Sequence, residues 1–371
     1  MLKAYKYRIY PNEEQKVQLA KTFGCVRYVF NYYLAKRIDL YKTIKKSMSK
    51  TDCNNHCNQE LKKEFVWLKE VDKFALTNSI YHVDDAYRKF FKEHAGFPKF
   101  KSKKTHKYSY TTNFTNNNIE CDFENNFIKL PKLDKVVCKL HQDFFGQIKS
   151  ATISQVPSGK YFVSVLVEQE QISELPKNNN ICAFDLGLKE FIVDNQDNHI
   201  QDPRTMYKYE QKLVMLQRQI AKKEKGSKNW HKQRIKIARL HEKISNIRND
   251  FQHKLSSKIV NENQIIISED LNVKGMKQNP KLAKRISDVA WSEFCRKLTY
   301  KSIWYGRTYH KIDRWFPSSQ ICNKCGYKNK GVKDLGIREW NCQECGTYHQ
   351  RDVNAATNIE KQGLKELGLA V

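Results

Sequence analysis

The chain has 371 residues, and its 67 Lys and Arg against 40 Asp and Glu give a formal charge of +27. No apolar run approaches the roughly 18 residues that a membrane helix needs. Residues 1–10 alternate charged and aromatic side chains, which is unlike the apolar core of a secretory signal. These features exclude a membrane protein and favour an intracellular, cytoplasmic protein with two or three domains.

The positive charge favours a polyanionic partner, with nucleic acid as the first candidate. Each Lys or Arg that replaces a counterion on a phosphate adds affinity without regard to base sequence. A basic surface that is merely well solvated is the alternative, and charge alone does not name an activity.

The amino-terminal half is expected to combine a strand, a helical insertion and further strands. The alternation in Tyr5–Ile9 predicts a strand, and Pro11 to Glu14 begins a helical pattern that continues to about Glu93. Five short strands are expected at 119–123, 127–130, 136–140, 151–156 and 161–167. With the first strand they predict a small β-barrel, which ends at the polar segment 170–180.

Aromatic residues and lysines are interleaved between Gly96 and Lys104 without a helical period. Such a strap can lie on a phosphate backbone while its aromatic rings stack on bases. A solvated charged loop is the alternative.

In the second half, two apolar strands each end in an acidic residue. The strand 181–184 leads into Asp185, and the β-branched run 264–268 leads into Glu269. A further strand is expected at 191–193, and two long basic helices lie between Tyr207 and Val260, broken near Gly226. Because reactive groups gather where parallel strands end, Asp185 and Glu269 would converge if their strands are neighbours.

A third acid, Asp352, begins an Ala-rich helix. Its alternative role is to offset the helix macrodipole. Three carboxylates brought together repel one another, so such a cluster favours divalent cations, and Mg²⁺ prefers oxygen ligands. Two such ions could support phosphodiester hydrolysis.

Four cysteines have the spacing of a zinc site. Cys322 and Cys325 form one Cys-x-x-Cys pair, Cys342 and Cys345 form another, and a glycine follows each pair. This pattern predicts a Cys₄ zinc ribbon, in which four thiolates leave no open position for catalysis. A dithiol redox pair is the alternative. The other seven cysteines are expected to be unpaired, and Trp291, Trp315 and Trp340 are expected to anchor cores.

Four segments together resemble a known family. They are Phe184-Asp185-Leu186-Gly187-Leu188-Lys189, the run from Ser268 to Met276, Phe316-Pro317-Ser318-Ser319-Gln320, and Arg351-Asp352-Val353-Asn354-Ala355-Ala356. In this order they resemble the TnpB (OrfB) family of bacterial insertion sequences, which is related to the type V CRISPR effector nucleases. One departure is Ala183-Phe184 before Asp185, where the family more often has Gly-Ile.

The resemblance implies an α/β RNase H-like (RuvC) nuclease core with an inserted helical hairpin and a Cys₄ zinc ribbon, plus an amino-terminal β-barrel (wedge) domain that carries a helical insertion. The implied boundaries are 1–10 and 96–176 for the wedge, 11–95 for a helical recognition domain, 177–315 and 349–371 for the nuclease core, and 316–348 for the ribbon, a target nucleic-acid binding module.

The resemblance also implies an activity. Asp185, Glu269 and Asp352 occupy the catalytic positions and would hold two Mg²⁺ ions, with one structural Zn²⁺ on the cysteines. A guide RNA from the transposon end would direct cleavage of double-stranded DNA beside a short motif, in the bacterial cytoplasm and at the nucleoid. Expected nucleic-acid contacts are Lys73, Thr77, Asn78, Lys99, Lys101, Lys103, Lys104 and Thr112. A transposase that transfers strands and a repressor that does not cut are the competing readings.

Overall fold

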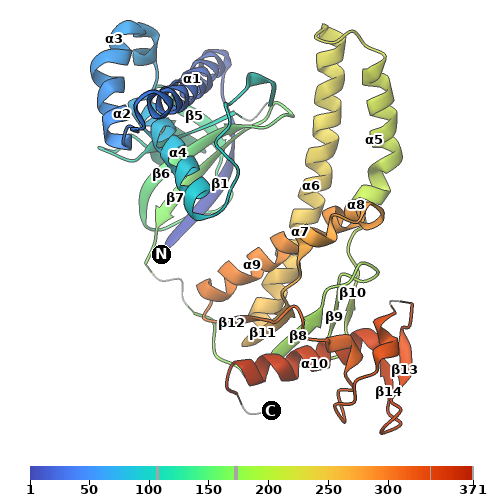
Figure 1. Ribbon diagram of the computed structural model, residues 1–371. Helices are drawn as coiled ribbons and strands as arrows, with labels where there is room; N and C mark the ends of the chain where they lie inside the picture. The colour runs from blue at the N-terminus through green and yellow to red at the C-terminus, as the bar shows by residue number, and fades with distance from the viewer. Residues whose placement is uncertain (106–107, 171–173, 335, 370–371) are drawn as a thin grey trace. The chain divides into compact units, whose positions relative to one another are not determined.

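The computed structural model describes residues 1–105, 108–170, 174–334 and 336–369. The chain divides into two compact units, Met1–Glu170 and Gln171–Val371 (Figure 1). The division falls at the start of the polar segment 170–180. Within the described ranges, no helix combines the length and the apolar character that crossing a membrane requires.

The first unit is built on a seven-stranded antiparallel sheet. Its strands are β1 (Leu2–Tyr10), β2 (Tyr108–Asn113), β3 (Glu120–Asp122), β4 (Phe127–Leu130), β5 (Asp134–Lys139), β6 (Gln147–Gln155) and β7 (Tyr161–Glu168). Their order is β2-β6-β7-β1-β5-β4-β3, so the first strand of the chain lies at the centre. Among the described residues the edge strands β2 and β3 do not pair with each other, so backbone hydrogen bonds do not close the sheet into the barrel that the sequence predicts.

The helices of the first unit follow β1 directly. They are α1 (Glu13–Ile44), α2 (Lys50–His56), α3 (Lys62–Glu64) and α4 (Lys73–Lys92), with a π-helical turn at Cys57–Leu61 and 3₁₀ turns at Val66–Glu70 and Lys103–Thr105. A capping box fixes the start of α1, because the Asn12 side chain accepts from the Gln15 backbone N–H and the Gln15 side chain accepts from the Asn12 N–H. Asp72 is the N-cap of α4, and its carboxylate accepts a hydrogen bond from the Ala75 backbone N–H.

The alternation of β1 determines how this unit packs. Tyr5, Tyr7 and Ile9 are buried, whereas the residues between them are more exposed. They share one hydrophobic cluster with Phe23 of α1 and Leu76 of α4. The helices therefore pack on the sheet.

The second unit contains a five-stranded mixed sheet and a two-stranded one. The strands are β8 (Ile181–Asp185), β9 (Ile192–Asp194), β10 (His199–Ile200), β11 (Ile265–Glu269) and β12 (Thr308–Ile312), in the order β10-β9-β8-β11-β12, with β13 (Glu339–Asn341) paired to β14 (Tyr348–Gln350). β8, β11 and β12 run parallel, and β9 runs antiparallel to both of its neighbours. The strand that the sequence predicts to be buried on both faces is β11, which lies inside the sheet between β8 and β12.

Helices cover both faces of the five-stranded sheet. The helices of this unit are α5 (Thr205–Ala221), α6 (Lys228–Glu262), α7 (Val273–Met276), α8 (Pro280–Val289), α9 (Trp291–Trp304) and α10 (Arg351–Glu366), with 3₁₀ turns at Ser318–Gln320 and Lys330–Lys333. Buried residues of α6, α8 and α9 share one cluster with the sheet, and buried residues of α10 share another. Ala183 and Ile267 lie in a cluster with Ile359 of α10. Phe184 points to the other face, where it shares a cluster with Phe294 of α9. The unit is thus an α/β/α sandwich, and among the described residues α10 is the helix that covers the second face.

The two long basic helices predicted between 207 and 260 form a hairpin of α5 and α6. Leu213 and Leu216 of α5 pack against Leu240 and Ile244 of α6. The turn between the helices contains Gly226 at φ +93, a conformation that favours glycine.

One prediction about the aromatic anchors is wrong. Trp291 and Trp340 are buried, but Trp315 is 84% exposed. It directly precedes the Phe316–Gln320 motif on a loop, where no apolar period indicates which side is buried. The seven other cysteines are unpaired, and all except the half-buried Cys121 are buried.

Candidate functional site

Two of the predicted acids end adjacent parallel strands. β8 pairs with β11 in a register that sets Phe184 beside Ser268, so the next residues, Asp185 and Glu269, close the two strands side by side. Because side chains alternate along a strand, Asp185 shares the face of Ala183, and Glu269 shares the face of Ile267. That is the face covered by α10.

The third acid reaches the same place from α10. Asp352 lies in the first turn of this helix, and α10 packs closely on β8 and β11. At Gly363 a Cβ atom would come within 2.5 Å of the Ile267 side chain, so glycine permits the close approach of helix and strand. The charges of Glu269 and Asp352 both act on Asp185, so the three acids lie near one another where β8 and β11 end.

The charges of the three acids act on one another. Burial, and after it the nearby carboxylates of Glu269 and Asp352, together raise the pKa of Asp185 to about 7. Burial also raises the pKa of Glu269, while the hydrogen bond from Ser318 lowers it. Without a cation, Asp185 and Glu269 therefore hold their protons to a higher pH than isolated carboxylates do.

Neighbouring groups hold Glu269 in place. The Ser318 hydroxyl donates a hydrogen bond to a carboxylate oxygen of Glu269, and Asn358 of α10 donates from its side chain to the Ser318 carbonyl at 2.8 Å. The adjacent acid, Asp270, is paired instead with Arg314 and with Lys311. Glu269 rather than Asp270 is therefore the acid that joins the cluster.

A cation from the ribbon pairs with Asp352. The Arg338 guanidinium lies 3.2 Å from one carboxylate oxygen of Asp352 and 3.3 Å from the other. Both groups are accessible, with 47% of the Arg338 side chain and 24% of the Asp352 side chain exposed. No sequence pattern singles out Arg338, because its position in the ribbon does not indicate which helix it contacts.

The four cysteines converge more tightly than the acids do. The sulfur atoms of Cys322, Cys325, Cys342 and Cys345 all lie within 4.8 Å of one another. Among the described residues, no other group of three or more Cys, His, Asp or Glu meets that limit. The glycines after the two pairs, Gly326 and Gly346, have positive φ angles of 80 and 70, as the two tight turns require.

His349 supports this cluster. Its Nε2 atom lies 3.0 Å from the Cys322 sulfur, and its ring packs on Trp340 with centroids 4.6 Å apart. Burial lowers the pKa of His349, so the ring is neutral at physiological pH. The set of four sulfurs is complete without it.

The predicted nucleic-acid contacts on α4 and β2 differ in accessibility. Lys73 is exposed, whereas Thr77 and Asn78 are half-buried. The Thr77 hydroxyl donates to Asn54, and the Asn78 side chain donates to the Thr111 carbonyl at 2.8 Å. Thr112 is fully buried, so its side chain does not lie on the surface of the unit. The alternation Tyr110-Thr111-Thr112 could have indicated this, because Tyr110 faces the core.

The strap after α4 is fixed to α1 through one asparagine. Asn31 accepts from the Lys101 backbone N–H at 2.8 Å and donates to the Lys101 carbonyl at 2.9 Å. The Lys101 ammonium lies over the Phe30 ring, 3.9 Å from its centroid. Lys99, Lys103 and Lys104 are exposed.

Three family models match the chain. One described as "Probable transposase" (OrfB_IS605) matches residues 164–280, one described as "Cas12f1-like, TNB domain" matches 291–359, and one described as "Helix-turn-helix domain" (HTH_OrfB_IS605) matches 1–46. In the structure, residues 1–46 form β1 and the 32-residue helix α1. The ribbon lies within the second match.

Relatives and solved structures agree with these matches. A protein of Streptomyces pristinaespiralis named "Putative RNA-guided DNA endonuclease" is 36% identical over 98% of this chain and 89% of its own length. The similarly named InsQ of Escherichia coli K12 is 29% identical over 98% of this chain and 92% of its own length.

The fold resembles a Cas12f1 chain in complex with sgRNA and target DNA, with a TM-score of 0.65, 12% identity and coverage of 97% of this chain and 98% of that one. It also resembles the mini-RNA-guided endonuclease CRISPR-Cas_phi3, with a TM-score of 0.53, 10% identity and coverage of 98% and 92%. The predicted RuvC-type core and zinc-ribbon module are thereby confirmed as a fold. The chain belongs to the TnpB (OrfB) family.

Proposed function

We propose that this protein is an RNA-guided DNA endonuclease that hydrolyses phosphodiester bonds with divalent metal ions. The observation that carries the proposal is the meeting of Asp185, Glu269 and Asp352. The register of β8 and β11 aligns two of these acids, and the first turn of α10 adds the third. The names of the relatives support the same activity.

The donor set fits Mg²⁺. Three carboxylates offer the hard oxygen ligands that this ion prefers. The raised pKa of Asp185 reflects burial first and then repulsion by the other two carboxylates, and a bound cation would offset both. When bound, a pair of such ions supplies an activated water and stabilises the leaving oxygen. Asp185, Glu269 and Asp352 are the residues that would hold them.

The chain's own residues orient this site. Ser318 fixes one oxygen of Glu269, and Asn358 fixes Ser318. Arg338 neutralises part of the charge on Asp352, and the same guanidinium would donate hydrogen bonds to a phosphate oxygen when a nucleic-acid strand reaches the acids.

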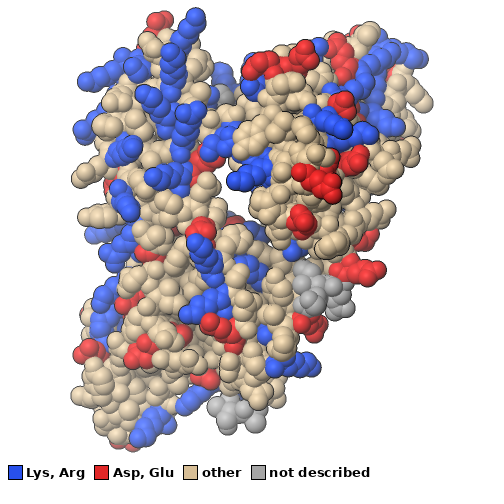
Figure 2. Space-filling view, turned by 180° about the vertical axis from the view of Figure 1, so that it is seen from behind, with Lys and Arg blue, Asp and Glu red and all other residues tan. Residues whose placement is uncertain are grey.

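The proposed partners are a guide RNA from the transposon end and double-stranded target DNA. Lys and Arg side chains crowd over the lobe formed by the α5–α6 hairpin, at the upper left of Figure 2. We assign the first unit to the wedge and recognition functions. Lys73, Lys99, Lys101, Lys103 and Lys104 are its proposed contacts with nucleic acid.

We assign a structural Zn²⁺ to the ribbon. Four thiol groups within 4.8 Å of one another match a tetrahedral site. Because α10 begins directly after β14, the ribbon also sets where Asp352 starts the helix.

The experiment that tests the function is a change of guide. The protein is purified with the RNA that accompanies it, and that RNA is sequenced and remade with a different guide segment. Cleavage of DNA matching the new guide in Mg²⁺ is the expected result. Joining of DNA ends without any guide would instead indicate a transposase, and occupied but unbroken target DNA would indicate a repressor.

A further inference from the structure

The loop that follows Asp185 is tightly constrained. The Leu186 backbone N–H hydrogen-bonds to the Asp185 carboxylate and lowers its pKa. At Gly187 a Cβ atom would come within 2.7 Å of the Glu190 carbonyl oxygen, so the turn tolerates no larger residue without moving. A shift of this loop would therefore move a hydrogen-bond donor of Asp185.

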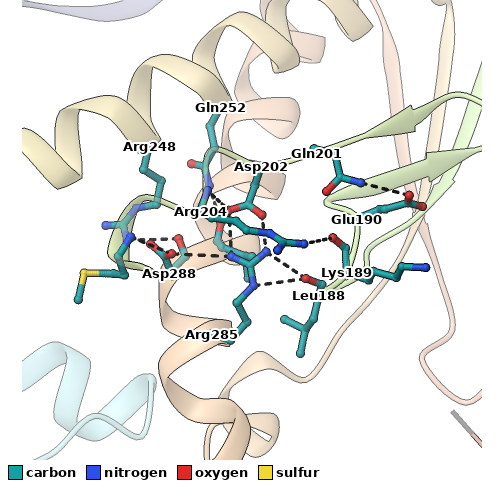
Figure 3. A network of polar contacts seen from close by, with 12 residues as sticks. Leu188, Lys189, Glu190, Gln201, Asp202, Arg204, Arg248, Gln252, Arg285 and Asp288 are labelled. Carbon is teal, nitrogen blue, oxygen red and sulfur yellow. Dashed lines mark hydrogen bonds and ion pairs between the residues drawn. The ribbon is translucent and has the colours of Figure 1, made fainter. Parts of the chain in front are cut away.

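One arginine from α8 holds this loop. Arg285 donates to the Leu188 carbonyl from Nε at 3.3 Å and from Nη2 at 3.0 Å. Its guanidinium also forms a two-point ion pair with Asp202, one contact being Nη1 to Oδ2 at 3.0 Å. Figure 3 shows Arg285 between the Leu188 carbonyl and the Asp202 carboxylate. The Asp202 side chain is only 5% exposed, so this pair is largely shielded from water.

The same carboxylate fixes the start of the helical hairpin. Asp202 accepts from the Arg204 backbone N–H at 3.0 Å, immediately before α5. On α8, one turn after Arg285, Asp288 accepts a hydrogen bond of 3.1 Å from the Met206 backbone N–H in the first turn of α5. Arg248 of α6 donates to the Ser287 carbonyl at 3.3 Å. Both helices of the hairpin are therefore attached to α8.

The far part of the hairpin is the most basic part of this unit. Its exposed cations between residues 218 and 243 are Arg218, Lys222, Lys225, Lys228, Lys232, Lys236, Arg239 and Lys243. The acids in the same stretch are Glu224 and Glu242. A polyanion that binds these side chains would consequently exert an electrostatic force on α5 and α6.

We propose that Arg285 is a positioning residue for Asp185, which couples the base of the hairpin to the loop after the strand β8. The ion pair between Arg285 and Asp202 moves with the base of the hairpin. The contact of Arg285 with the Leu188 carbonyl transmits that movement to the turn in which the Leu186 N–H hydrogen-bonds to Asp185. This inference rests on the proposed nuclease function.

The substitution Arg285→Lys tests this inference. Lysine keeps the positive charge but lacks the planar guanidinium that binds the Asp202 carboxylate and the Leu188 carbonyl at the same time. The matched control is Arg296→Lys, which alters an exposed guanidinium paired with Glu293 on α9. In the RNA-loaded protein, we expect Arg285→Lys to cleave about 10- to 100-fold more slowly, as a small misplacement of a reacting group does, with DNA affinity within about twofold of wild type. Asp202→Asn should act in the same direction.

A second readout does not depend on cleavage. Amide hydrogen exchange of residues 186–190 should become faster in Arg285→Lys and stay unchanged in Arg296→Lys, at equal melting temperatures. Wild-type cleavage and exchange rates in Arg285→Lys would overturn the inference, and so would a slower rate explained by lost DNA binding or a lowered melting temperature. Failure of the wild-type complex to cut guided DNA would overturn the proposed function, whereas the exchange measurement would still test Arg285.

Discussion

The Ser318 hydroxyl donates a hydrogen bond to the Glu269 carboxylate, and this contact joins the second acid to the segment that leads into the ribbon. Asn358 of α10 donates to the Ser318 carbonyl and to the Ile321 carbonyl at 2.6 Å. One short turn therefore connects β11, the ribbon and the helix that carries Asp352.

Ser318→Ala should weaken the site without removing an acid. The Glu269 carboxylate would lose a hydrogen bond that stabilises its charged form, so its pKa would rise. Partners of this kind typically contribute 10- to 100-fold to metal affinity or activity, and we expect about a tenfold loss in cleavage rate at pH 7. Ser319→Ala, one residue along, is the control. Equal rates for the two variants would show that Ser318 does not orient Glu269.

Arg338→Gln should tighten divalent-metal binding in the absence of nucleic acid. Arg338 places a positive charge 3.2 Å from Asp352, and that charge opposes a second cation on the same carboxylate. Titration with Mn²⁺ should show affinity about three- to tenfold higher than wild type. Arg314→Gln removes a comparable ion pair from Asp270 and should leave the affinity unchanged. Weaker binding by Arg338→Gln would contradict this assignment.

Without metal, Asp185 should make stability fall as the pH rises. Its pKa is about 7 in the folded protein, above its usual value of 3.8, so between these values the folded state binds more protons than the unfolded state and loses stability with rising pH. Asp185→Asn cannot ionise. Its free energy of unfolding relative to wild type should therefore increase between pH 5 and pH 8, as measured by urea denaturation in EDTA. A difference that stays constant with pH would refute the raised pKa.

Loss of one ribbon cysteine should release zinc. Cys342→Ser leaves three sulfurs, and because metal binding and folding are coupled in such modules, the ribbon should unfold locally. Elemental analysis should find about one zinc per wild-type chain and close to none in the variant. Cys121→Ser, which changes a half-buried cysteine outside the cluster, should retain the metal. Full zinc content in Cys342→Ser would argue against a four-cysteine site.

The second unit could largely be predicted from the sequence. The run Ile265–Ile267 is β-branched and continuous, which is typical of a central strand buried on both faces, and the acids stand where such strands end. The cysteine pairs and their glycines are local patterns with little ambiguity. Each of these patterns can be recognised from a few residues that are neighbours in the sequence.

The contacts that complete the site could not be predicted in the same way. Arg338, Arg285 and Asp202 meet their partners across long stretches of chain, and no local pattern states which helix an arginine will face. The strand order of the first unit likewise depends on distant pairings, and so does the lack of pairing between the edge strands β2 and β3 in the part of the chain that the structure describes. Thr112 is buried because it shares the inward face of β2 with Tyr110, so the prediction that it contacts nucleic acid is wrong.

The most direct test of the three-acid site is cleavage by isosteric variants. Asp185→Asn, Glu269→Gln and Asp352→Asn each keep the shape of the side chain and remove its charge. In Mg²⁺, with the guide RNA bound, each should cut matched DNA at least about 1,000-fold more slowly than wild type, since two-metal chemistry depends on every charged ligand, while RNA binding stays within about twofold. Wild-type cleavage by any of the three would contradict a shared metal site.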